Sequence, residues 1–190
     1  VGLLSSFFLE KEKKCKIVYE SRAMWNIEDL IKQSSGIGIV SKTGHSFIKQ
    51  AMRDSNAVYG GEMSAHHYFR DFAFCDSGMI PWLLVLELLS KTEQTIHDLI
   101  EDRLKKFPSS GEINFQVRDP DQVIRKIYNK FEGQGEINQI DGLSINFKEW
   151  RFNVRKSNTE SLLRLNIEAK GDTELLNEKT RSLSGLISSV

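Results

Sequence analysis

The sequence of 190 residues has little cysteine, no net charge and no apolar run of membrane length. Its 2 cysteines, Cys15 and Cys75, are too few for a disulfide framework, so we expect reduced thiols and a cytoplasmic protein. Its 26 Lys and Arg residues balance its 26 Asp and Glu residues. The balanced charge gives no broad field of the kind that attracts nucleic acid or an acidic membrane surface, so we predict neither partner.

The apolar segments are too short or too interrupted to span a bilayer. Residues 79–89 form one long apolar run, but they contain Pro81 and Glu87 and fall short of the ~20 residues that a spanning helix needs. Residues 1–9 are apolar, but basic residues follow them, whereas a secretory signal carries its charge first. The chain also starts without Met inside a predicted helix, so we expect a piece of a longer protein.

The first part of the chain alternates short apolar strands with helices. Strand candidates lie at residues 17–19, 37–40, 57–59 and 68–74, with helical stripes at residues 27–31 and 47–52. The alternation implies right-handed crossovers and predicts an α/β domain with a mainly parallel mixed sheet flanked by helices. The helix predicted at residues 81–89 is apolar nearly all round, which predicts that it is buried.

The pattern changes after a turn-rich segment at residues 107–111, which predicts a domain boundary between residues 1–108 and residues 109–190. Beyond it, Asp119 and Pro120 would cap one helix, and Gly171 and Asp172 would start another. Alternating apolar residues predict strands at residues 113–117, 143–147, 152–154 and 163–169. Neighbouring strands with short connections predict an α+β domain with an antiparallel sheet and helices on one side.

The stretch at residues 60–69 carries the most informative polar side chains. Gly60 and Gly61 would let the backbone turn sharply after a buried strand. Glu62, Ser64 and His66 fall at alternate positions, so in an extended segment they would project from one face. A carboxylate, a hydroxyl and an imidazole suit a polyol ligand, although a solvated loop has the same composition. A zinc site is not indicated, because adjacent histidines point to opposite faces of a strand.

Two further stretches have the composition of anion sites. Lys42 and His45 flank a glycine-containing turn between a strand and a helix, where backbone N–H groups and the helix dipole attract anions. Arg155 stands two residues before Ser157, and its guanidinium fork matches two phosphate oxygens. The alternative for this second stretch is a plain hairpin loop, since Ser and Asn are ordinary turn residues.

Residues 41–49, 60–66 and 155–160 resemble, in order and spacing, three motifs of the α-D-phosphohexomutases, and are most similar to the phosphomannomutase/phosphoglucomutase branch. The resemblance extends over most of the chain but covers only the third and fourth of the family's four domains. Ser161 departs from the family, which commonly has proline there.

The resemblance implies three groups of site residues. Glu62 and Ser64 would hold the O3 and O4 hydroxyls of a hexose, and His66 would support their loop or reach the ligand. The remaining assignments are Arg22, Lys42 and His45 at the reacting end, and Arg155, Ser157, Asn158 and Thr159 around the phosphate that does not react.

The resemblance also implies an isomerase that moves a phosphoryl group between O1 and O6 of mannose. A phosphoserine, Mg²⁺ and a bisphosphorylated hexose activator would act in the full-length enzyme, but we find neither the serine loop nor the Asp-rich metal loop here. We therefore expect an inactive half that binds no cofactor alone, whose partners are a hexose phosphate and the N-terminal domains of its parent chain. The alternatives are a phosphoglucomutase or dual-specificity mutase, a non-catalytic sugar-phosphate-binding module, or a structural protein that has lost the site.

Overall fold

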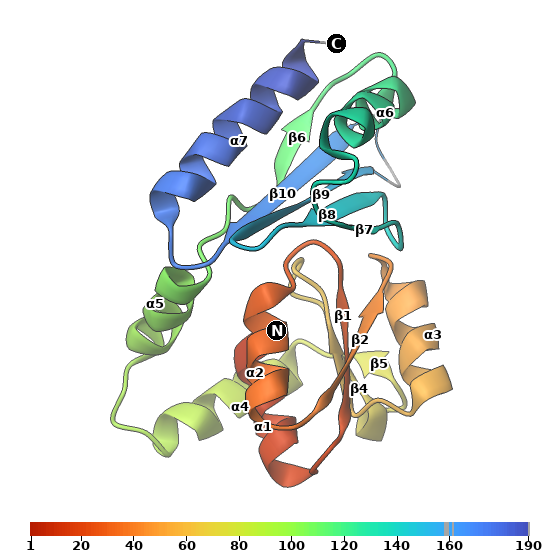
Figure 1. Cartoon of the computed structure of the whole chain (residues 1–190). Helices are drawn as coiled ribbons and strands as arrows, with labels where there is room; N and C mark the ends of the chain where they lie inside the picture. The colour runs from red at the N-terminus through yellow and green to blue at the C-terminus, as the bar shows by residue number, and fades with distance from the viewer. Residues whose placement is uncertain (158–159, 161, 190) are drawn as a thin grey trace. The chain divides into compact units, whose positions relative to one another are not determined.

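The computed structural model describes residues 1–157, 160 and 162–189, and the chain divides into two compact units (Figure 1). The first unit is Val1–Arg103 and the second is Leu104–Val190. The division falls shortly before the turn-rich segment at residues 107–111.

The first unit contains a mixed five-stranded sheet in the order β2-β1-β3-β4-β5. Strand β1 pairs in parallel with β2 and β3, whereas β4 runs antiparallel to β3 and β5 to β4. The predicted mainly parallel mixed sheet is confirmed. Its strands are β1 (Lys16–Glu20), β2 (Ile37–Ser41), β3 (Tyr59–Gly61), β4 (His67–Phe69) and β5 (Cys75–Asp76).

Helices cover both faces of this sheet (Figure 1). Side chains alternate along a strand, so Ile17 and Tyr19 pack in the core beneath α1 and α2, while Val18 packs beneath α3. The helices are α1 (Gly2–Lys11), α2 (Trp25–Gln33), α3 (His45–Ser55), α4 (Met79–Ser90) and α5 (Ile96–Lys106), with a short 3₁₀ helix, η1 (Arg70–Phe72). The single strand predicted at residues 68–74 is wrong in its extent: β4 ends at Phe69, η1 follows, and β5 begins only at Cys75.

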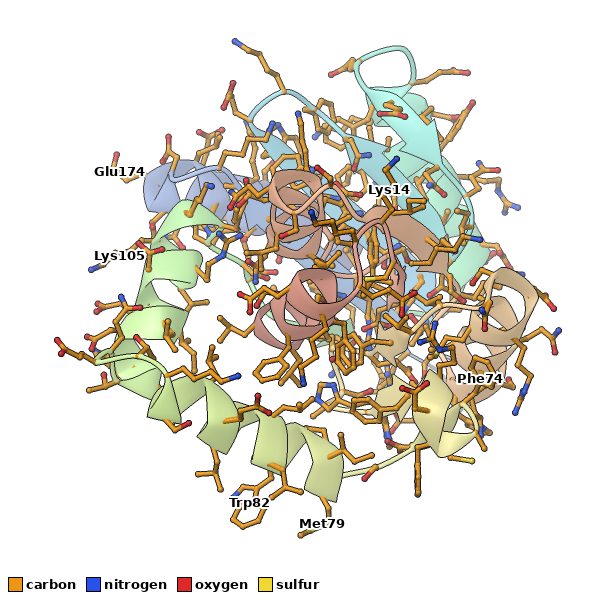
Figure 2. The ribbon with its side chains drawn as sticks, turned by 90° about the horizontal axis from the view of Figure 1, so that it is seen from below. Lys14, Phe74, Met79, Trp82, Lys105 and Glu174 are labelled. Carbon is orange, nitrogen blue, oxygen red and sulfur yellow. The ribbon has the colours of Figure 1, made fainter. Side chains whose placement is uncertain are left out.

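The expectation that the helix at residues 81–89 is buried is wrong. Only Pro81 of α4 is buried, whereas the side chains of Met79 and Leu83 are 64% and 53% exposed. Figure 2 shows Met79 and Trp82 projecting outward from the helix. One side of α4 packs on the core through Leu84 and its neighbours, so an apolar composition all round did not mean burial all round.

The second unit contains a five-stranded antiparallel sheet in the order β6-β10-β9-β8-β7, as predicted for an α+β domain. Helices α6 and α7 lie on one face of it and share a single core with its inner side chains (Figure 1). Asp119 and Asp172 cap these helices by accepting backbone N–H bonds of 2.9 and 2.8 Å. The elements are β6 (Ile113–Phe115), α6 (Pro120–Phe131), β7 (Glu136–Asn138), β8 (Leu143–Asn146), β9 (Trp150–Lys156), β10 (Leu163–Ala169) and α7 (Thr173–Ser188).

No helix in the described part of the chain combines the length and the apolarity that a membrane crossing requires.

Candidate functional site

The loop after β3 lies at the carboxyl edge of the parallel strands and forms a tight turn. The Glu62 backbone N–H donates to the His66 carbonyl at 2.9 Å, and the Ala65 N–H donates to the Glu62 carbonyl at 3.1 Å. Ala65 adopts a left-handed φ of 66°. The expectation of an extended segment here is therefore wrong, because the side chains meet through the turn and not through strand alternation.

The two glycines before this turn also act differently from the expectation. Neither Gly60 nor Gly61 has a positive φ, and both belong to β3. A Cβ added at Gly60 would lie 2.6 Å from the sulfur of Met52. Gly60 therefore allows α3 to pack closely on the sheet, and the turn itself begins after the strand.

A cavity of about 450 Å³ lies beside the turn and brings several predicted site residues together. Its lining includes Glu62, Ser64 and His66 from the turn and His45 from the start of α3. Lys49, Tyr68 and Asp76 also belong to its polar wall. A carboxylate, a hydroxyl and two imidazoles around one cavity offer both donors and acceptors to a polyhydroxylated ligand.

The Glu62 carboxylate is held in one orientation inside the first unit. Its side chain is only 4% exposed, and its Oε1 and Oε2 accept bonds from the Tyr68 hydroxyl at 2.6 Å and the Gly44 N–H at 3.0 Å. Burial, together with the hydrogen bond to Glu62, raises the pKa of the Tyr68 phenol, so the hydroxyl stays protonated and donates. Each carboxylate oxygen keeps a further lone pair for a ligand hydroxyl.

His66 is oriented by a carboxylate on the neighbouring strand. Its Nδ1 donates to Asp76 Oδ2 at 2.7 Å, and Asp76 Oδ1 accepts the His67 backbone N–H at 3.1 Å. Burial acts to raise the pKa of the Asp76 carboxyl, but the hydrogen bonds from His66 and His67 outweigh it and hold the pKa below its usual value. Asp76 therefore stays ionised, which fixes the proton of His66 on Nδ1 and leaves Nε2 for a ligand.

Glu20, at the end of β1, joins three loops of the first unit. Its carboxylate accepts the Thr43 hydroxyl at 2.7 Å and the Met63 backbone N–H at 2.6 Å. It also accepts the Arg22 Nε–H at 2.8 Å and forms an ion pair with Arg22 Nη2 at 2.7 Å. Glu20 is 2% exposed, so this network is internal and fixes the loop after β2 and the loop after β3 relative to β1.

Arg22 and Lys42 lie outside the lining of the cavity that contains Glu62. Arg22 is buried against Glu20. The Lys42 ammonium stands 5.7 Å from the centre of the Phe47 ring. Of the three residues predicted to face the reacting end, the structure brings His45 alone into the cavity wall with Glu62.

Arg155, in the second unit, is paired with carboxylates. Its side chain is 3% exposed, with Nη2 3.3 Å from Glu112 Oε2 and Nε 3.9 Å from Asp141 Oδ2. Ser157 follows it and accepts the Glu160 N–H through its hydroxyl at 3.2 Å. Asn158 and Thr159, predicted to hold phosphate, and Ser161, which replaces the usual proline, lie outside the described residues.

The described residues contain no group of three or more His, Cys, Asp or Glu side chains that could hold a metal ion. The Mg²⁺ expected of the full-length enzyme therefore has no such ligand set in the described part of this chain.

Sequence reasoning assigned no site role to Glu20, Tyr68, Asp76 or Glu112. No local pattern marks these residues, since each meets its partner, as Asp76 meets His66, through sheet register or loop packing.

The structure thus defines a two-domain chain in which an α/β unit carries a polar cavity and an antiparallel α+β unit carries a buried arginine. Residues 1–107 match the family described as "Phosphoglucomutase/phosphomannomutase, alpha/beta/alpha domain III". Residues 112–181 match "Phosphoglucomutase/phosphomannomutase, C-terminal domain". The chain therefore belongs to the phosphoglucomutase/phosphomannomutase family, as the three motifs indicated.

Individual relatives agree with this assignment. The chain is 50% identical over 188 residues to the phosphomannomutase of Salmonella typhimurium, covering 98% of this chain and 41% of that protein. The chain is also 50% identical over 188 residues to the phosphohexose mutases of Xanthomonas campestris, covering 98% of this chain and 42% of that protein. The crystal structure of a phosphoglucomutase/phosphomannomutase family protein from Burkholderia thailandensis matches with a TM-score of 0.78 at 27% identity, covering 95% of this chain and 39% of that chain. The chain thus spans about two-fifths of the length of each relative.

Proposed function

We propose that this chain is the substrate-binding part of a phosphomannomutase, an isomerase that interconverts mannose 6-phosphate and mannose 1-phosphate. The observation that carries the proposal is the orientation of Glu62. A carboxylate fixed by Tyr68 and Gly44 at the wall of a polar cavity is preorganised to accept two neighbouring hydroxyls of a sugar ring. The family membership of both units supports the same function.

In this proposal Glu62 and Ser64 hold O3 and O4 of the hexose. His66, fixed by Asp76, presents Nε2 to the ligand, and His45 faces the reacting end with Lys42. Arg22 contacts the reacting end only if the Arg22 guanidinium binds both Glu20 and the ligand. Arg155, Ser157, Asn158 and Thr159 hold the phosphate that does not react, and the phosphoserine, Mg²⁺ and activator belong to the remainder of the enzyme.

A titration of the 190-residue chain with mannose 1-phosphate tests this proposal. We expect weak binding, with a Kd of roughly 1 mM, because a site without its other domains is only partly preorganised. Glu62→Ala and Arg155→Met should each remove measurable binding. Arg125→Met, which changes an exposed arginine on α6, is the matched control and should bind as the unchanged chain does. Equal binding by all four chains would contradict the proposal.

A broader hexose specificity is the second candidate, favoured by the similarity to the Xanthomonas phosphohexose mutases. Residues that hold O3, O4 and the phosphate make no use of C2, where mannose and glucose differ. Glucose 1-phosphate should therefore bind within about threefold of mannose 1-phosphate, since one hydroxyl outside the contact set discriminates weakly. A difference larger than tenfold would favour a dedicated phosphomannomutase.

A further inference from the structure

Two arginines of the second unit face each other across adjacent strands. Arg155 on β9 is the direct antiparallel partner of Arg164 on β10. Like charges directly opposite each other destabilise a sheet. Glu112, just before β6, relieves this by placing Oε2 3.3 Å from Arg155 Nη2 and Oε1 3.2 Å from Arg164 Nη1. One carboxylate thus bridges the two arginines, which we call the arginine pair, and Glu160 Oε2 binds Arg164 Nη2 alone at 2.7 Å.

The bridge is loose compared with another ion pair on the same sheet. Arg151 Nη1 and Glu168 Oε2, also on β9 and β10, are 2.7 Å apart and almost wholly buried. Charge-assisted bonds between N–H and carboxylate oxygen are commonly about 2.7–2.9 Å long. The two distances from Glu112 to the arginines are longer than this, so these two contacts are weaker than such bonds usually are. Glu112 is therefore better placed to be exchanged than Glu168.

The arginine pair also has donors without a hydrogen bond, although Arg155 Nε lies 3.9 Å from Asp141 Oδ2. The Nε groups of both arginines are buried and make no hydrogen bond with the described residues. A buried donor without an acceptor is costly, and an arginine is always charged. A phosphate offers more acceptor oxygens and more charge than one carboxylate, so it satisfies the pair better than Glu112 does.

We propose that Glu112 is the resident anion of the arginine pair, and that the phosphate of a hexose phosphate displaces its carboxylate when it binds. The inference rests on the proposed function, because Arg155 is the arginine assigned there to the phosphate. It adds Arg164 as a second phosphate-binding residue and makes Glu112 an internal competitor that sets the affinity. No covalent bond changes; one anion replaces another at two guanidinium groups.

Phosphate binding to Glu112→Gln tests this exchange. In the 190-residue chain, this variant should bind both inorganic phosphate and mannose 1-phosphate about fivefold more tightly than the unchanged chain, measured by calorimetry at fixed ionic strength, since it removes a charged competitor. Asp121→Asn is the matched control, because it removes the same charge from an exposed partner of Lys156, next to Arg155. Its affinity should change less than twofold. Arg164→Met should weaken both ligands.

The outcomes separate this inference from the proposed function. If the unchanged chain binds mannose 1-phosphate and Arg155→Met does not, but Glu112→Gln binds equally or more weakly, the competitor role is overturned and the function stands. If neither the unchanged chain nor Glu112→Gln binds either ligand, both fail. Glu112→Asp guards against misfolding, since it keeps the charge but is too short to span both arginines. It should also bind phosphate more tightly, and unchanged or weaker binding by a folded Glu112→Asp overturns the inference.

Discussion

Glu20 accepts the backbone N–H of Met63 at 2.6 Å, and this bond links the end of β1 to the turn that carries Glu62 and Ser64. The same carboxylate binds Thr43 and Arg22, so one buried side chain holds the loops that follow three parallel strands. The shape of the candidate sugar cavity therefore depends on Glu20, which is not one of the residues that line this cavity.

Glu20→Gln should destabilise the first unit by about 3 kcal/mol. The change leaves the Arg22 charge buried without its carboxylate, and breaking a buried ion pair in this way is costly. Urea unfolding measures the change, with Glu10→Gln as a control because Glu10 is exposed on α1. A loss below about 1 kcal/mol would show that the network contributes little.

Tyr68→Phe should weaken mannose 1-phosphate binding by about threefold to tenfold and leave the fold intact. The change removes one donor that orients Glu62 and leaves the aromatic ring in place. Tyr128→Phe is the control, since its hydroxyl bonds Glu132 on the surface of α6. An unchanged affinity in Tyr68→Phe would mean that the Gly44 N–H alone orients the carboxylate.

Adjacent leucines on α4 should respond in opposite ways to the same substitution. Leu83→Lys should change the free energy of unfolding by no more than about 0.5 kcal/mol, because this side chain is exposed. Leu84→Lys should cost about 2 kcal/mol or more, since Leu84 packs on the core of the first unit. Urea unfolding of the two variants gives both values. A large loss in Leu83→Lys would show that another surface covers this side of α4.

The first unit should lose stability as the pH falls from 6.5 to 4. Burial lowers the pKa of His67 from 6.5 to about 4. Between these values the unfolded chain binds a proton that the folded chain excludes, so protonation favours unfolding, and above pH 6.5 the contribution is constant.

Unfolding midpoints in urea at pH 5.0 and 6.5 check this dependence. His67→Gln should show a smaller difference between the two midpoints than the unchanged chain does. His97→Gln, which changes an exposed histidine on α5, should not alter the difference. Equal differences in all three chains would assign the acid sensitivity to the carboxylates instead.

The sequence by itself determined the order of elements and the class of each unit. Strand and helix periodicity depends on neighbouring residues, and so does the cap at Asp119, which the structure contains as predicted. The motifs at residues 41–49, 60–66 and 155–160 were also sufficient for the family, which the matches to both units confirm. These features are local, so the linear sequence contains them.

Only the tertiary structure decided which side chains meet. Glu20 and Met63 come together because β1 and β3 are adjacent in the sheet, and Glu112 meets Arg155 because β6 and β9 both flank β10. The sequence likewise did not predict that one side of α4 is exposed, since an apolar helix has the same sequence pattern whether or not a neighbour covers it. Contacts between residues far apart in the chain follow from sheet order and loop packing, and no periodicity or motif in the sequence encodes them locally.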